Sequence, residues 1–235
     1  MNGNMIDIKS DAGSGYTGYL SKPESTKGPG ILLIQEIFGV NSHIKEVADL
    51  YAAAGYVVLA PDVFWRVEPG VQLGYTPEDI QKGAALAGKC KPEEIVQDLG
   101  KALQTLKQQP QFAGKVGAVG YCMGGTYAYL LATADLVDVA VGYYGGNIDK
   151  YLDAAKNLHC PIMLHFGEKD THIPQSKVEA IAAALKGKGH VEIFVYKNAD
   201  HGFNCDQRKS YDRQSAMLAF GRTMVLTDGI LKGTA

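Results

Sequence analysis

Short apolar runs alternate along the chain with longer segments in which apolar and polar residues repeat at helical spacing. This alternation is typical of a mostly parallel β-sheet with helices on both faces. The apolar runs predict strands at residues 5–8, 17–20, 30–35, 56–60, 116–119, 139–142, 162–166 and 191–196. The helical spacing predicts helices at residues 42–54, 77–87, 92–108, 124–134, 177–186 and 210–226. We expect the first two strands to pair antiparallel at one edge of the sheet.

Composition and length fit one α/β domain. The chain has 235 residues, of which 46% are hydrophobic, and no repeat or long linker divides it. We therefore expect a single domain over residues 1–235, with enough apolar material for one sizeable core. We expect it to act as a monomer or a small homo-oligomer.

Charge and cysteine content narrow the partners and the compartment. A formal net charge of −2 and a pI near 6.3 give no electrostatic reason to expect nucleic acid or a membrane surface as a partner. We find neither a signal-like amino end nor a membrane-spanning apolar stretch. The 4 cysteines are widely separated and form no CxxC pair, so we expect reduced thiols and a cytoplasmic protein.

Cys122 carries the strongest chemical signal. It stands in Gly120-Tyr121-Cys122-Met123-Gly124-Gly125, after an apolar run and before an apolar helical segment. This is the sequence of a nucleophile elbow with cysteine in the serine position, in which a strand turns sharply into a helix. The first amides of that helix would favour both a thiolate and an oxyanion. The alternative is a buried cysteine that serves only as a small hydrophobe.

Two further residues complete a triad in the chain order expected for an α/β-hydrolase sheet. Asp170 and His201 each follow a predicted strand, and ligands of open sheets gather beyond the carboxyl ends of the strands. The order Cys122, Asp170, His201 is that of nucleophile, acid and histidine in such a sheet. Alone, Asp170 reads equally well as a turn residue and His201 as a loop histidine.

The residue types assign the roles. Cys122 would attack a carbonyl, His201 would keep the thiolate as an ion pair and later activate water, and Asp170 would orient the imidazole. The outcome would be hydrolysis through a thioester. The histidines show no metal-ligand spacing, so we expect no metal site.

Over nearly its whole length the chain resembles the dienelactone hydrolase family, a cysteine branch of the α/β hydrolases. The resemblance rests on five motifs: Gln35-Glu36-Ile37-Phe38-Gly39-Val40-Asn41, Ala60-Pro61-Asp62, the elbow itself, Val141-Gly142-Tyr143-Tyr144-Gly145 and His201-Gly202-Phe203. It implies a carboxymethylenebutenolidase-like carboxylic ester hydrolase of aromatic compound catabolism, which opens the enol-lactone ring of a dienelactone to maleylacetate. It implies the triad Cys122, Asp170 and His201, and no cofactor or metal.

The resemblance also gives Glu36 a role beside the resting thiol. A nearby carboxylate disfavours the thiolate, so the idle cysteine would stay largely neutral and resist oxidation. Without the resemblance, Glu36 reads as a helix-capping or surface-paired residue. The oxyanion donors would be the backbone amides of Ile37 and Met123.

The sequence departs from the family pattern where the substrate binds. The two arginines that hold the dienelactone carboxylate correspond here to Gln81 and Cys205, and neither side chain offers a guanidinium fork. Lys82, Arg66 and Arg208 are possible replacements, although each reads more readily as a surface or structural residue. Tyr144 ends a predicted strand at the active edge, where it would line the pocket or pack in the core.

These observations favour a hydrolase that opens a dienelactone-type enol-lactone, or cleaves a small activated ester, through a cysteinyl thioester. Two alternatives remain open. One is a thiol esterase or thioesterase with another small substrate. The other is a non-catalytic ligand binder or thiol sensor, against which the intact acid and histidine argue, because sensing needs no oriented triad.

Overall fold

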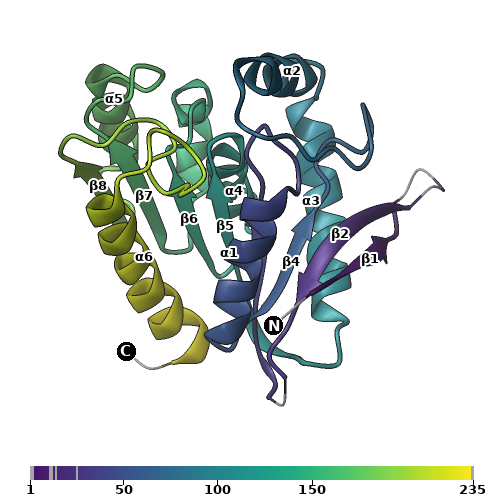
Figure 1. Ribbon diagram of the computed structural model, residues 1–235. Coiled ribbons are helices and arrows are strands. Elements are labelled where there is room, and N and C mark those ends of the chain that lie inside the picture. The colour runs from purple at the N-terminus through teal and green to yellow at the C-terminus, as the bar shows by residue number, and fades with distance from the viewer. Residues whose placement is uncertain (1–2, 11–12, 14, 25, 234–235) are drawn as a thin grey trace. The chain divides into compact units, whose positions relative to one another are not determined.

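The computed structural model describes residues 3–10, 13, 15–24 and 26–233 of the chain (Figure 1). It divides into two compact units, residues 1–116 and residues 117–235. The expectation of a single domain over the whole chain stays a prediction.

Four strands lie within the first unit: β1 (Asn4–Ile8), β2 (Tyr16–Ser21), β3 (Gly28–Ile34) and β4 (Val57–Pro61). Their order is β1-β2-β4-β3, and the β1/β2 and β2/β4 pairs are antiparallel while β3 and β4 are parallel. The antiparallel pairing expected of the first two strands is confirmed. Every residue of β3 and β4 is buried, as the near-continuous apolar runs predict for strands covered on both faces.

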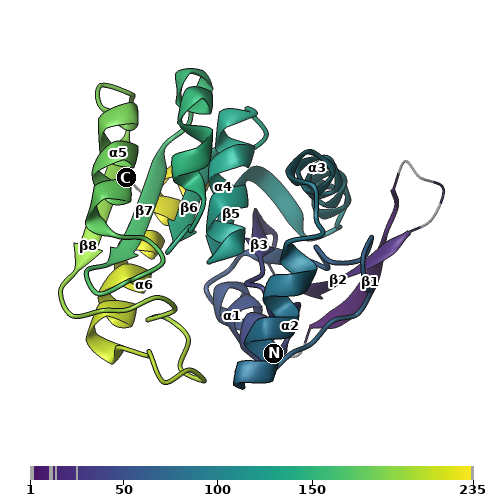
Figure 2. The same ribbon diagram turned by 90° about the horizontal axis from the view of Figure 1, so that it is seen from above.

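The covering helices of this unit are α1 (Ser42–Ala53) and α3 (Pro92–Lys107), which lie on opposite faces of the strands (Figure 2). A third helix, α2 (Pro77–Ala87), begins at a capping box in which Thr76 and Asp79 satisfy each other's backbone donors. At α1, the side chain of Asn41 accepts a hydrogen bond from the amide of Ile44. Both helices begin at the residues predicted from the sequence, Ser42 and Pro77, because these capping hydrogen bonds fix their first turns.

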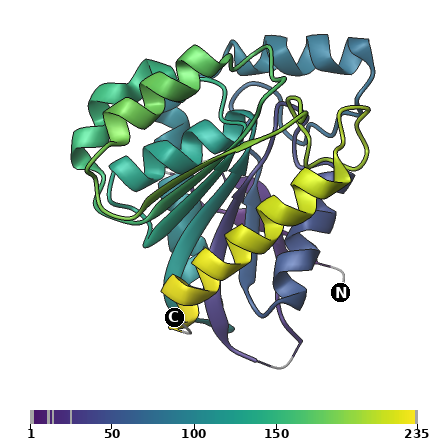
Figure 3. The ribbon, with the colours of Figure 1, turned by 90° about the vertical axis from the view of Figure 1, so that its left-hand side faces the viewer.

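The second unit has a parallel arrangement. Strand β5 (Phe112–Tyr121) enters it and is followed in order by β6 (Val139–Tyr143), β7 (Ile162–Gly167) and β8 (Val191–Tyr196), all parallel. Helices α4 (Met123–Thr133) and α5 (Gln175–Leu185) lie on one face, and α6 (Arg213–Thr227) crosses the other (Figure 3). The carboxyl ends of these parallel strands therefore share one edge, where Cys122, Asp170 and His201 follow β5, β7 and β8.

The α/β architecture expected from the sequence is confirmed, with three differences in detail. Strand β5 begins at Phe112, before its apolar core. A 3₁₀ segment, η1 (Ile148–Asn157), and a π-helical segment, η2 (Asp228–Lys232), were not expected. Within the described residues, no helix has the length and apolar character needed to cross a membrane.

Candidate active site

The turn between β5 and α4 has the geometry of a nucleophile elbow. Cys122 has φ 52° and ψ −116°, a conformation that side-chain-bearing residues seldom adopt. A Cβ atom at Gly120 would meet the carbonyl oxygen of Gly124, so the turn can close only with glycine there. The amide of Cys122 donates to the carbonyl oxygen of Tyr143 at 2.9 Å, which anchors the elbow to β6.

Close packing fixes the start of the helix after the elbow. A Cβ at Gly125 would lie 2.8 Å from the carbonyl oxygen of Tyr143, so glycine lets α4 approach β6 closely. Met123 is the first residue of α4, and the first amides of a helix have no intrahelical acceptor. The amide of Met123 directly follows Cys122 at the start of α4, and its role as an oxyanion donor stays a prediction.

His201 bridges Cys122 and Asp170. Its Nε2 lies 3.1 Å from the Sγ of Cys122, and its Nδ1 lies 2.7 Å from the Oδ2 of Asp170. The other carboxylate oxygen of Asp170 accepts hydrogen bonds from the amides of His172 at 2.9 Å and Ile173 at 3.1 Å. The amides of the loop after β7 therefore hold the Asp170 carboxylate in position. By binding Nδ1 of His201, this carboxylate leaves Nε2 facing the Cys122 sulfur.

Electrostatics favour an ion pair across this triad. Burial by itself would lower the pKa of His201, but the facing Cys122 and the hydrogen bonds with Asp170 and Cys122 raise it to about 10. Burial would raise the pKa of Asp170, but the hydrogen bond with His201 and the two loop amides lower it below its usual value. An imidazolium between a carboxylate and a sulfur is the state that a thiol nucleophile needs.

Two aromatic rings contact the imidazole of His201. The ring of Tyr144 lies 5.1 Å from that of His201 in an edge-to-face contact, and the ring of His172 lies 5.2 Å away. Tyr144 is fully buried and has φ 39°, a strained value for a tyrosine. Its contact with His201 is that of a residue packed behind the triad, and its predicted role in substrate binding remains untested.

His172 has no place in the sequence-based site. The absence of metal-ligand spacing among the histidines gives it no role, and its position two residues after Asp170 is the signal that could have found it. It is exposed, and its ring contacts that of His201.

A buried polar network lies beneath these residues. His165 on β7 is fully buried, with Nδ1 2.9 Å from the hydroxyl of Tyr196 and Nε2 3.1 Å from that of Thr223. The Thr223 hydroxyl also lies 2.6 Å from that of Tyr143, which stacks on Tyr121 just before Cys122. Burial, with a smaller contribution from Arg222, lowers the pKa of His165 to about 3, so this imidazole is neutral.

The remaining predicted machinery lies in residues 1–116. Glu36 follows β3 and is 1% exposed, which is unusual for a carboxylate. A Cβ at Gly83 of α2 would meet the carbonyl oxygen of Ile37, so this glycine lets the helix pack on the loop. The roles of Glu36 beside the thiol and of the Ile37 amide as an oxyanion donor stay predictions.

The two residues at the missing arginine positions differ in exposure. Gln81 is exposed on α2, whereas Cys205 is fully buried. Of the possible replacement cations, Arg66 is engaged by Asp98 through two hydrogen bonds of 2.7 and 2.8 Å, and Lys82 pairs with Glu68 at 2.7 Å.

Of the three possible replacement cations, Arg208 is the nearest in sequence to the triad. A Cβ at Gly202 would meet its guanidinium, so Arg208 packs against the backbone that follows His201. This places it in the histidine loop, and its contact with substrate stays a prediction.

The other cysteines differ from Cys122 in their surroundings. Burial raises the pKa of Cys160 to about 11 and that of Cys90 above its usual value, and Cys205 is fully buried. All four are free thiols.

Known proteins resemble this chain over almost its full length. The model of the dienelactone hydrolase family matches residues 16–229. A carboxymethylenebutenolidase of Pseudomonas putida is 32% identical over 220 residues, which cover 93% of each chain. A protein of Synechocystis sp., provisionally named for the same activity, is 36% identical over 226 residues and 92% of each chain.

Solved structures show the same fold. A Klebsiella pneumoniae protein, provisionally described as a dienelactone hydrolase, superposes with a TM-score of 0.84 at 28% identity, covering 95% of this chain and 96% of its own. The dienelactone hydrolase-like phosphotriesterase P91 from metagenomic libraries has a TM-score of 0.80 at 20% identity, covering 98% of this chain and 100% of its own.

Fold and relatives together define an α/β hydrolase that acts on carboxylic esters. Within that class, the chain belongs to the dienelactone hydrolase family.

Proposed function

We propose that this protein hydrolyses the enol-lactone ring of a dienelactone-type substrate, or a small activated ester, through a thioester on Cys122. The observation that carries the proposal is the single imidazole of His201, held at 2.7 Å from Asp170 and 3.1 Å from the Cys122 sulfur. The carboxymethylenebutenolidases among the relatives support the lactone as substrate.

The first half of the reaction forms the thioester. The Cys122 sulfur attacks the lactone carbonyl, and the oxygen takes up negative charge beside the amide of Met123. The intermediate then collapses by breaking the ring carbon–oxygen bond, and the leaving enolate oxygen takes the proton of the His201 imidazolium. The carbonyl carbon is now bound to sulfur, and His201 is neutral.

The second half releases the acid. Neutral His201 takes a proton from water, whose oxygen attacks the thioester carbonyl, and the carbon–sulfur bond breaks. The thiolate and the imidazolium are restored, so one water is consumed for each ring opened. Asp170 stabilises the imidazolium in both halves without itself taking the proton.

A turnover screen tests the proposal directly. We would measure hydrolysis of dienelactones, neutral enol-lactones and aryl esters by the wild-type protein beside Cys122→Ala. Lactone turnover that disappears in the variant supports the proposal. Turnover confined to thioesters would favour the thioesterase alternative, and no turnover of any substrate by the wild type would favour a non-catalytic role.

Asp170→Asn is expected to lower kcat by about 10²–10⁴-fold, because an amide favours the wrong imidazole tautomer. Glu168→Gln is the matched control: it neutralises a neighbouring carboxylate that accepts a hydrogen bond from the amide of Asn198 at 3.0 Å. Steady-state rates on one lactone compare the two variants. A near-normal rate for the Asp170 variant together with a large loss for the Glu168 variant would assign the acid to Glu168.

Weak discrimination between an anionic dienelactone and a neutral lactone of similar shape is expected. A charge-assisted pair contributes about 1.5–3 kcal/mol, and neither Gln81 nor Cys205 can form one with a carboxylate. The measurement is the ratio of kcat/KM for the two substrates in wild type, Arg208→Ala and Lys82→Ala. A strong preference for the anion that disappears in one variant would show that this cation has taken over the clamp.

We also infer a cytoplasmic setting for the enzyme. The free state of all four cysteines supports this inference, because a thiol nucleophile is preserved where disulfides are kept reduced.

A further inference from the structure

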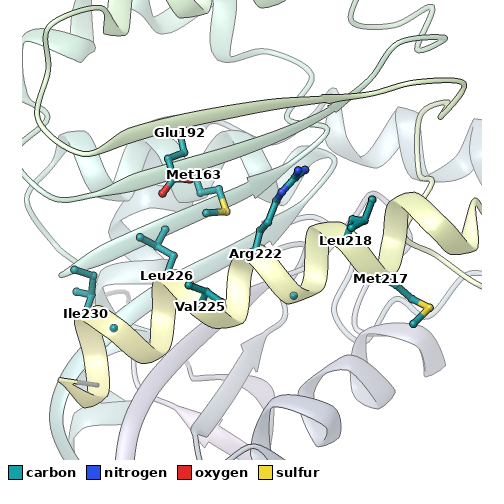
Figure 4. A pocket seen from close by; sticks show the side chains of 10 residues that line it. Met163, Glu192, Met217, Leu218, Arg222, Val225, Leu226 and Ile230 are labelled. Carbon is teal, nitrogen blue, oxygen red and sulfur yellow. The ribbon is translucent and has the colours of Figure 1, made fainter. Parts of the chain in front are cut away.

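An apolar groove runs along the outer side of the second unit, away from the triad. It lies between helix α6 and strands β7 and β8 and has a volume of about 510 Å³ (Figure 4). Its helix side includes Met217 and Val225, which are 62% and 76% exposed. Apolar side chains this exposed, gathered along one groove, mark a surface that another molecule covers.

The groove borders a strand edge with hydrogen-bonding capacity. Among the residues that the structure describes, β8 is the last strand in the order of this unit and pairs with β7 alone. Its sequence, Val191-Glu-Ile-Phe-Val-Tyr196, is rich in β-forming residues, and Val195 is 42% exposed. An apolar edge of this kind is a ready template for pairing with another strand.

Two opposite charges line the groove. The guanidinium carbon of Arg222 lies 4.0 Å from the centre of the Phe194 ring, and its Nη1 donates to the Tyr196 hydroxyl at 3.0 Å. Glu192 lies on the face of β8 that also carries Phe194 and Tyr196, and it lines the groove (Figure 4). In the part of the chain that the structure describes, neither side chain forms an ion pair.

From these features we infer that two copies of this chain associate through their β8 edges, so that Glu192 of each copy meets Arg222 of the other. A two-fold axis normal to the sheet makes the two β8 strands antiparallel and keeps each face of the sheet continuous. Opposite residues must then point to the same face, which allows only registers that pair residues of equal parity.

The register centred on Phe194 brings opposite charges together on one face of the sheet and apolar side chains together on the other. It places Phe194 opposite itself and Glu192 opposite Tyr196 of the second copy. Arg222 donates a hydrogen bond to the Tyr196 hydroxyl, so the Glu192 carboxylate of one copy would lie beside the Arg222 guanidinium of the other. The two-fold symmetry produces the same ion pair a second time. On the other face Val195 meets Ile193, so the exposed valine becomes covered. The reciprocal charges are what select a second copy as the occupant of this groove.

Sedimentation velocity over a range of protein concentrations tests the inference. The wild type is expected to be a dimer at micromolar concentration, and Glu192→Arg is expected to weaken dimerisation by about 100-fold, because it places like charges together at two symmetric sites. Glu179→Arg is the matched control, since Glu179 is exposed on α5, outside the groove. A monomeric wild type, or a dimer equally insensitive to both reversals, would overturn the inference.

Mixing two variants tests the pairing itself. Glu192→Arg and Arg222→Glu should each be largely monomeric, whereas an equimolar mixture should form heterodimers, because each interface then holds two opposite-charge pairs. No heterodimer from two folded variants would contradict the pairing. If Arg222→Glu does not fold, Val225→Lys replaces it as a second test of the groove, and a dimer that it leaves intact counts against the inference.

Discussion

Replacing Cys122 by alanine is expected to lower kcat/KM for a lactone by at least about 10⁴-fold, because removal of the nucleophile leaves only substrate binding and the oxyanion donors. Cys122→Ser should retain only a trace of activity, since a hydroxyl has a far higher pKa than a thiol. The same dependence should appear chemically: stoichiometric alkylation should abolish turnover and map by mass spectrometry to Cys122.

The other thiols provide the control. Cys160 and Cys90 should label slowly, because burial raises the pKa of both. Cys160→Ala should keep wild-type turnover. Full activity in Cys122→Ala would remove the thioester mechanism.

His201→Ala is expected to cost about as much as losing the nucleophile, on the order of 10⁴-fold or more in kcat/KM, because triad members act as a unit. His172→Ala is the matched control: it removes a second imidazole whose ring lies 5.2 Å from that of His201. Comparable losses in the two variants would mean that the histidines share the proton transfer.

The pH profile gives an independent measure of the His201 role. The pKa of His201 is raised to about 10, so below that pH the imidazolium is present and can protonate the leaving oxygen. The wild-type kcat/KM should therefore fall as pH rises through about 10. A profile that falls instead near the ordinary histidine pKa would show that the ion pair is not the reactive state.

Strand positions were predicted well where side-chain pattern alone decides them. Strand β8 was predicted at its observed bounds, Val191 to Tyr196, because an apolar run lies between a glycine-rich turn and polar residues. Strand β5 begins four residues earlier than its apolar core, at Phe112. Its lead-in is largely exposed, and an extended backbone that buries few side chains leaves no mark in hydropathy. The segment η1 was not predicted, and its backbone is interrupted at Tyr151, which has the non-helical angles φ −123° and ψ 26°.

The elbow glycines and the short motifs around Cys122, Asp170 and His201 could be read from the sequence because each motif is local, and the chain order of the three residues is a property of the sequence itself. The burial of Tyr144 behind His201 could not, since it depends on a left-handed residue just past β6. The hydrogen-bonded network of His165, Tyr196 and Thr223 joins residues up to 58 positions apart, and nothing in the local sequence of each marks the others. The surroundings of the triad therefore depend on packing between segments that are distant in the sequence, which local motifs do not reveal.

The buried His165 of that network also makes the stability of the folded protein depend on pH in the acid range. The folded protein holds His165 neutral down to a pH of about 3, whereas an unfolded chain protonates it near the ordinary value of 6.5. Between these two values the unfolded chain binds one more proton at this site, so acid favours unfolding there. The free energy of unfolding should decline as pH falls below about 6.5, which denaturant titrations at successive pH values would measure. Acid would therefore inactivate this enzyme by opening its interior.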